Sequence, residues 1–324
     1  MKYLILTVLL LLSFSFTSTA QEGKVRFANL SSSEDNESFN AIREAFRERN
    51  PGYDMWYLSN TRQVEPRDYT QVLFVQAIKG ITKDGVTNPD VKAQAAIIGN
   101  SGSREESEAI VGDILILNEG EEMQTDVEVG ILVFKIPKPP ENELPSFIRP
   151  DWDPNITDVP GGCATDIDAY RRILLTWKKE VGEYIYHAIN AHRVRIYDSF
   201  SHYHPVDGGF DEFYLVQMVK PGAKIITSEK TDQITSPEEV KESEVDKLID
   251  EYELKVGDLV YLPRGVMHRG VDGVVAQVIT MPGFIPGSEI GVDHHLRAIN
   301  ERLGLNGDDA LPYNVEHSNE AVIR

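Results

Sequence analysis

The sequence predicts a mainly β fold made of two similar units, each a β-sandwich or β-barrel with flanking helices. Three observations support this fold class. Two sequence blocks recur in the same order, short β-rich runs bounded by turn residues fill both halves, and each half begins with a helical pattern. The chain has 324 residues, which is enough for two ordinary domains.

The composition excludes several classes of protein. The chain carries 52 acidic and 32 basic side chains, for a net charge of -20. Nucleic-acid binding and docking on anionic lipid both need clustered Lys and Arg, so we expect no nucleic-acid partner and no membrane partner. Cys163 is the one cysteine, which rules out an intramolecular disulfide and a cysteine-rich zinc site.

Residues 1–20 have the pattern of a secretory signal peptide. Lys2 gives a positive start, an apolar run follows from Tyr3 to Phe16, and small residues lead to Ala20. This run is too short to span a membrane comfortably. We therefore expect cleavage near Ala20 and an exported protein, either periplasmic or secreted.

The internal repeat is the most informative feature of the sequence. Val111–Gly120 and Val256–Gly265 share the pattern V-G-D, four mostly aliphatic residues, x-x-G, at an offset of 145 residues. Gln71–Lys79 and Glu212–Lys220 also correspond, at an offset of 141. Two blocks in the same order with nearly equal offsets indicate two related units.

The first unit is predicted to span residues 21–145. Its helix runs from Asp35 to Asn50, with apolar side chains at helical spacing, and ends at Pro51-Gly52. Short β-rich runs follow this helix. A proline-rich linker is predicted at residues 146–162.

The second unit is predicted to span residues 163–324. Thr165–Val181 has a capping-box start and one apolar face, which predicts a helix. A helical insertion is expected at residues 228–252, with its helix starting at Ser236. A last helix is expected at Ser288–Leu303, ended by Gly304.

Four residues of the second unit form a candidate metal site. His202 and His204 are two apart, so on a strand both imidazoles point to one face. Glu212 begins the next β-rich run, and His268 follows a Pro-x-Gly turn. Three imidazoles and one carboxylate leave coordination positions open on an octahedral ion, as in Mn, Fe, Co or Ni sites.

The motifs around these residues resemble those of the cupin superfamily, G-x5-H-x-H-x(3,4)-E-x6-G and G-x5-P-x-G-x2-H-x3-N. The second motif matches at Gly257, Pro263, Gly265 and His268, with Asp272 in place of Asn. The first motif keeps both histidines, but seven residues separate His204 from Glu212, and Ile196 replaces its opening glycine. The longer hairpin leaves Asp207 and Asp211 as alternative fourth ligands.

The resemblance implies two cupin-type, jelly-roll β-barrels, that is, a bicupin. By the repeat, Gln71 stands at the position of Glu212 and Met123 at that of His268. Thr61 and Gln63 stand near His202 and His204. The first unit is therefore expected to be a degenerate cupin without metal ligands.

The expected function is that of an exported, metal-dependent enzyme acting on a small organic molecule. The cofactor is one divalent transition metal (Fe, Mn, Ni or Zn), and the chemistry left open is that of a dioxygenase, a decarboxylase or lyase, or an isomerase. Strand alternation gives a mostly apolar pocket, with Tyr214 and Gln277 as polar, candidate catalytic side chains. The alternatives are a non-catalytic metal or small-ligand binding protein and a storage protein. A homodimer is one of the assemblies compatible with the sequence.

Overall fold

The computed structural model describes residues 23–31, 36–79, 91–137, 144–149, 171–176 and 187–324. The fold is mainly β, with two barrel-like sheets and flanking helices, which confirms the predicted fold class. Among the described residues, no helix is both long enough and apolar enough to cross a membrane.

One sheet has seven strands, all from the first half of the chain. Their order is β5-β4-β7-β3-β6-β8, with β2 paired to β7. The strands are β2 (Asp54–Val64), β3 (Thr70–Ile78), β4 (Ala93–Ile98), β5 (Arg104–Ala109), β6 (Ile114–Leu117), β7 (Glu122–Ile136) and β8 (Phe147–Ile148). We call this sheet the N-terminal barrel.

The other sheet has ten strands and contains the candidate metal residues. Its main path is β1-β15-β12-β16-β10-β9, with β11, β13, β14 and β17 attached beside it. The strands are β1 (Arg26–Asn29), β9 (Arg171–Leu175), β10 (Asn190–Asp198), β11 (His202–Tyr203), β12 (Asp211–Val219), β13 (Lys224–Ser228), β14 (Asp250–Glu253), β15 (Asp258–Leu262), β16 (Met267–Met281) and β17 (Ile290–Gly291). We call it the C-terminal barrel. It recruits β1 from the start of the chain, across the predicted domain boundary.

The two barrels pair their strands in the same register. Glu212 lies opposite Leu262 in the C-terminal barrel, and Gln71 lies opposite Leu117 in the N-terminal barrel. The two pairs differ by the repeat offsets of 141 and 145. Both inner strands also break register at the equivalent place, after Val216 in β12 and after Val75 in β3.

The repeated V-G-D turn has the same backbone structure in both barrels. The Gly112 N–H donates to the Val75 carbonyl at 2.9 Å, and the Gly257 N–H donates to the Val216 carbonyl at 3.0 Å. Their φ angles are 100° and 90°. A side chain is strained in this left-handed region, which explains the glycine in both copies.

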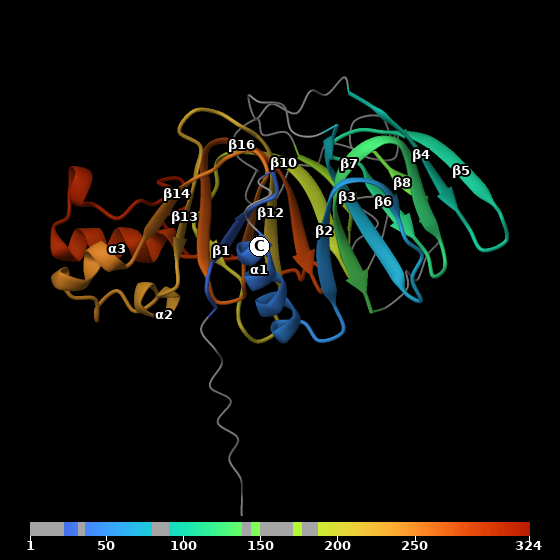
Figure 1. Ribbon diagram of the computed structural model, residues 1–324. Coiled ribbons are helices and arrows are strands. Elements are labelled where there is room, and N and C mark those ends of the chain that lie inside the picture. Colours follow the sequence, from blue (N-terminus) through green and yellow to red (C-terminus); the bar gives the residue numbers. More distant parts are fainter. Residues whose placement is uncertain (1–22, 32–35, 80–90, 138–143, 150–170, 177–186) are drawn as a thin grey trace, which may run out of the picture.

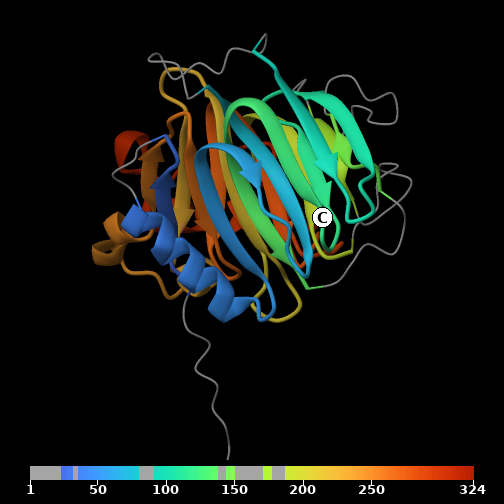
Figure 2. The same cartoon turned by 45° about the vertical axis from the view of Figure 1, so that its right-hand side comes forward.

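A shared core joins the two barrels. It contains Phe46 of α1 (Asn36–Arg49), Phe134 of β7 and Phe213 of β12, whose rings pack edge to face. Figure 1 shows β10, β12 and β16 in the middle of the molecule, with β2 to β8 on one side and α2 and α3 on the other. In Figure 2, α1 lies beside β1 and β2. The C-terminal barrel is thus held from one side by the N-terminal barrel.

The predicted helix at Thr165–Val181 is wrong within its described part. Residues 171–175 form β9 instead, antiparallel to β10. The exposed edge of β10 offers unpaired backbone groups, and pairing with them outweighs a weak helical propensity.

The helices at the end of the chain start later or are shorter than predicted. The last helix, α3, spans Asp293–Leu303, because β17 precedes it and pairs with β11. It ends as expected at Gly304, whose φ is 70°. In the insertion no helix starts at Ser236. A short α2 (Thr231–Ile234), a 3-10 turn (Glu242–Lys247) and β14 take its place, and a second 3-10 turn (Gly307–Asp309) follows α3.

The predicted signal peptide at residues 1–20 lies outside the described residues. So does most of the predicted linker at 146–162. Within its described part, Phe147 and Ile148 form β8 and pair with β6. Export stays a prediction.

Candidate metal centre

Three histidines converge inside the C-terminal barrel. His202 of β11 lies directly opposite His268 of β16, and His204 follows β11 immediately. One ligand atom from each of the three lies within 4.8 Å of the other two. All three side chains are fully buried. We call His202, His204 and His268 the histidine cluster.

Glu212 completes the set that the sequence predicted. It is the second residue of β12 and is buried among the histidines. Its Oε1 lies 3.2 Å from the Nε2 of His268, and its Oε2 lies 3.8 Å from the Nε2 of His204. The seven-residue hairpin therefore still brings the carboxylate to the histidine cluster.

Local backbone structure holds the histidines in place. Gly265 has a φ of 93°, and its N–H donates to the His204 carbonyl at 2.7 Å. The Pro-x-Gly turn that precedes His268 is thereby tied to the strand end that carries His204. In the hairpin, a Cβ on Gly209 would lie 2.2 Å from the Pro205 carbonyl oxygen, so the tight turn requires glycine.

In His202 and His268, a backbone contact occupies one ring nitrogen and leaves the other for a ligand. His202 Nδ1 lies 3.0 Å from the Phe200 carbonyl, and His268 Nδ1 lies 3.4 Å from the Val266 carbonyl. A carbonyl only accepts, so Nδ1 carries the proton and Nε2 presents a lone pair. Within the described residues, none of the three Nε2 atoms makes a hydrogen bond, although all are buried.

Burial also keeps these imidazoles neutral. It lowers the pKa of His202 to about 4, with the neighbouring His268 as the next cause. It likewise lowers the pKa of His268 to about 4. Burial and then the charges of His268 and His202 lower the pKa of His204 well below its usual 6.5. The neutral imidazole is the form that binds metal.

Aromatic rings enclose the histidine cluster. Phe200 stacks on His202 with ring centroids 4.4 Å apart, and Phe210 packs on His204 at 3.9 Å. Tyr214 stands edge-on to His268 at 6.2 Å. Phe200 lies two residues before His202 and so shares its face by strand alternation, but nothing in the sequence pattern marks either phenylalanine as part of the site.

Asp293 is a site-supporting residue that sequence reasoning missed. As the first residue of α3, it accepts hydrogen bonds from the N–H of Ser201 and of Asn314, both at 2.8 Å. The Ser201 bond fixes the backbone next to His202. No local motif signals this role, because the partners lie 92 and 21 residues away.

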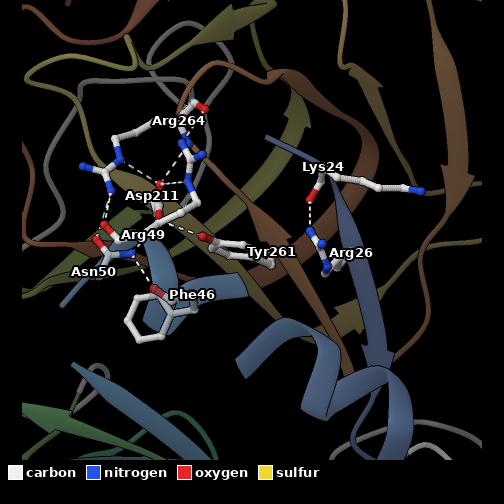
Figure 3. Close-up of polar contacts among 8 residues, drawn as sticks. All are labelled: Lys24, Arg26, Phe46, Arg49, Asn50, Asp211, Tyr261 and Arg264. Atoms are coloured by element: carbon white, nitrogen blue, oxygen red, sulfur yellow. Dashed lines mark hydrogen bonds and ion pairs between the residues drawn. The ribbon is translucent and has the colours of Figure 1, made fainter. Parts of the chain in front are cut away.

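Asp211 is not a fourth ligand, contrary to one sequence alternative. Its carboxylate is fully buried and accepts from the side chains of Asn50, Tyr261 and Arg264 and from the Arg264 backbone N–H, at 2.6 to 3.0 Å, while Arg49 lies 3.6 Å away (Figure 3). Its oxygens are occupied by these partners. Asp207, the other alternative, is exposed in the hairpin.

Gln277 also departs from its predicted place. It lies opposite Leu215, whose side chain belongs to the core shared with the N-terminal barrel. Its amide donates to the Gly112 carbonyl at 2.7 Å and accepts from Gln217 at 2.9 Å. Gln277 therefore links the barrels and does not face the histidine cluster. Tyr214 lies on the interior face, as predicted.

The remaining histidines lie outside the histidine cluster. His294 and His295 pack on each other on α3. His192 is buried on β10, and His187 is exposed. His317 packs against Phe200, with ring centroids 5.5 Å apart, so the segment after α3 reaches the aromatic wall of the histidine cluster.

Comparison with known proteins supports the resemblance for the second half. The JmjC domain family matches residues 185–281, which contain all four candidate ligands. This match supports the resemblance to the cupin superfamily, to which the JmjC domain is related. No curated protein matches the sequence.

Among solved structures, oxalate decarboxylase from Bacillus subtilis is similar. One structure, studied for its Mn(II) centres, has 10% identity and a TM-score of 0.48 and covers 93% of this chain and 84% of that chain. Another, at pH 4.6, has 10% identity and a TM-score of 0.46, with 93% and 83% covered. Identity at this level transfers no activity.

Proposed function

We propose that this chain is an exported, metal-dependent cupin enzyme acting on a small organic molecule. His202, His204, Glu212 and His268 would hold one divalent transition ion. The proposal rests on three buried Nε2 atoms that make no hydrogen bond to any described residue and lie beside a buried carboxylate. Buried polar atoms otherwise find partners, so this arrangement fits a metal.

The donor set narrows the kind of ion. Three imidazoles and one carboxylate suit Fe, Mn, Ni or Zn, and hard oxygen-seeking ions such as Mg²⁺ fit less well. Such an ion would activate O₂, polarise a carbonyl or carboxylate, or lower the pKa of a bound water. Oxygenase, decarboxylase or lyase, and isomerase chemistry all remain within the proposal.

The surrounding residues define how a substrate would be held. Val194 and Ile196 of β10 and Val260 of β15 line the barrel interior, so water is largely excluded and electrostatic interactions there are strong. Tyr214 is a polar side chain of this interior and would orient the substrate. Its phenol stands edge-on to the His268 ring. In the proposed bicupin, the N-terminal barrel carries no metal.

Metal analysis of the purified protein tests the proposal. We expect about one ion per chain after expression with added metal, and less than about 0.2 ion per chain for His268→Ala. Met123→Ala, at the equivalent position of the N-terminal barrel, is the matched control and should keep the ion. A wild-type protein that holds less than about 0.2 ion and does not rebind metal would contradict the proposal.

An oxygen-consumption screen then separates the chemistries. Iron together with O₂ uptake in the presence of small organic acids would indicate a dioxygenase. Mn, Ni or Zn without O₂ uptake would indicate lyase or isomerase chemistry. A retained ion with no turnover of any compound would favour the alternative, a non-catalytic metal or small-ligand binding protein.

A further inference from the structure

The N-terminal barrel has a pocket of about 370 Å³ that includes part of the position equivalent to the candidate metal site of the C-terminal barrel. The correspondence follows from the shared strand register. Two residues of the pocket wall are equivalent to candidate ligands. Gln71 lies opposite Leu117 as Glu212 lies opposite Leu262, and Val64 lies opposite Met123 as His202 lies opposite His268. Part of the metal-site position is thus retained in the N-terminal barrel with different side chains.

Gln71, at the floor of this pocket, has an unused hydrogen-bond acceptor. The side chain is fully buried, and its Nε2 donates to the Glu65 carbonyl at 3.0 Å. Its Oε1 is buried and makes no hydrogen bond within the described residues. Leaving a buried acceptor without a partner is unfavourable, so a ligand that donates a hydrogen bond would satisfy it. Contact requires a shift of rim side chains such as the exposed Gln63.

Aromatic and apolar side chains form one wall of the pocket. Trp56 and Tyr69 pack edge to face, with ring centroids 6.3 Å apart, and Leu58 lies beside them. All three are half-buried. Such a wall accommodates the apolar face of a ring that carries polar groups on its edge.

The charges around the pocket balance. Arg43 is bonded through two nitrogens to the carboxylate of Asp54, at 2.7 and 2.8 Å, so these two charges neutralise each other. Arg67 and Glu65 remain, one of each sign, and both are exposed. The lining residues therefore offer both donors and acceptors without a net charge, and Lys135, outside the lining, places its Nζ 4.7 Å from the centroid of the Tyr69 ring. A lining of this kind favours a neutral ligand rich in hydroxyl groups.

We propose that this pocket of the N-terminal barrel binds a neutral saccharide. A ring hydroxyl donates to Gln71 Oε1, the ring face packs on Trp56 and Tyr69, and Arg67 and Glu65 bond to hydroxyls at the rim. The site is separate from the histidine cluster and does not depend on the proposed metal or reaction. It gives the N-terminal barrel a binding role of its own.

Binding of glucose, galactose, mannose and cellobiose to the full chain tests this proposal, by saturation-transfer NMR and isothermal titration calorimetry. Gln71→Leu keeps the size of the side chain and removes the acceptor, so the dissociation constant should rise about tenfold. The variant removes an unsatisfied buried oxygen and also the hydrogen bond to the Glu65 carbonyl, so its stability without sugar should change little. Arg67→Gln, on the exposed rim, should weaken binding about fivefold.

Two controls separate this site from the metal centre. Met123→Leu changes the same apolar core outside the pocket and should leave sugar binding unchanged. His268→Ala should also leave it unchanged, while it removes the metal. The proposal is overturned if no neutral sugar binds at up to about 50 mM, about 2 kcal/mol of affinity. It is equally overturned if Gln71→Leu binds like wild type, or if glucuronate binds and glucose does not.

Discussion

The two barrels of this protein share one strand framework and differ in what fills it. At equivalent positions, the C-terminal barrel has Glu212 and His268, and the N-terminal barrel has Gln71 and Met123. In the C-terminal barrel, His268 lies with His202 and His204, and one ligand atom from each is within 4.8 Å of the other two. In the N-terminal barrel, Met123 lies in an aliphatic core and Gln71 faces a pocket.

This difference shows that the framework does not require the ligand set. Strand register, the break in β3 and β12 and the V-G-D turn persist without any histidine in the N-terminal barrel. Function therefore resides in a few side chains placed on a fold that forms without them. Residues next to the candidate ligands test this separation of fold and function, because they can stabilise the fold, position the ligands or do both.

Asp211 offers the largest expected effect on stability. It precedes Glu212, and its equivalent in the N-terminal barrel is Thr70. Asp211→Ala would leave the nearby Arg264 and Arg49 guanidinium groups and the Tyr261 hydroxyl without their shared acceptor. We expect a loss of about 3–5 kcal/mol in the free energy of unfolding, measured by urea denaturation. Thr70→Ala should cost about 1 kcal/mol.

Equal losses for these two variants would show that the Asp211 contacts add nothing beyond ordinary packing. Metal content adds a second measurement. Since the Arg264 N–H donates to Asp211 in the turn before His268, Asp211→Asn should fold and bind metal more weakly than wild type. Unchanged metal affinity in a folded Asp211→Asn protein would restrict Asp211 to a purely structural role.

Part of this comparison could be predicted from the sequence. The repeat offsets gave the equivalent positions, and the Pro-x-Gly spacing placed His268 beside the other histidines. These features involve residues that are close in the sequence or that repeat along it, so they can be recognised from the sequence alone. The helical pattern over residues 171–175 misled, because pairing with β10 depends on a strand about 20 residues away.

The remaining errors concern which face of a strand a side chain occupies. Gln277 was predicted to place its amide in the pocket. Its amide instead donates to the Gly112 carbonyl, 165 residues away in the other barrel. The longer hairpin made Asp211 an alternative ligand, but Asp211 adjoins Glu212 on β12, and adjacent residues of a strand point to opposite faces. Contacts between the barrels join residues far apart in the sequence, so no local sequence pattern predicts them.

Installing the C-terminal residues in the N-terminal barrel should not create a metal site. In a His268→Ala background, Gln71→Glu with Met123→His supplies two ligands. The strand register puts Val64, and not Thr61 as the sequence repeat suggested, at the position of His202, and Val64 has no donor atom. Gln63 is exposed, so it offers no third ligand either. Gln71→Glu alone should lower the free energy of unfolding by about 1–3 kcal/mol, since it buries a carboxyl group. Metal analysis and urea denaturation measure both effects. One ion per chain in the triple variant would show that the barrels are interchangeable.

The smallest expected effect concerns the first residues of β2 and β10. Asp54 lies opposite Lys135, and its equivalent Asn190 lies opposite Thr280, so one barrel has a carboxylate where the other has an amide. Burial alone would raise the pKa of Asp54, but the hydrogen bonds from Arg43 and from the Met55 N–H outweigh it, and the pKa falls below its usual 3.8.

A lowered pKa in the folded protein means that Asp54 contributes stability above pH 3.8 and loses it as the pH falls through the folded-state value. Asp54→Asn makes the N-terminal position resemble the C-terminal one. Because Arg43 is one-third exposed, we expect a loss of at most about 1 kcal/mol at pH 6. The difference from wild type should shrink below pH 4, as measured by urea denaturation across the pH range. A difference that stays constant from pH 6 to about pH 3 would mean that the charge of Asp54 does not contribute and that only its hydrogen-bonding shape does.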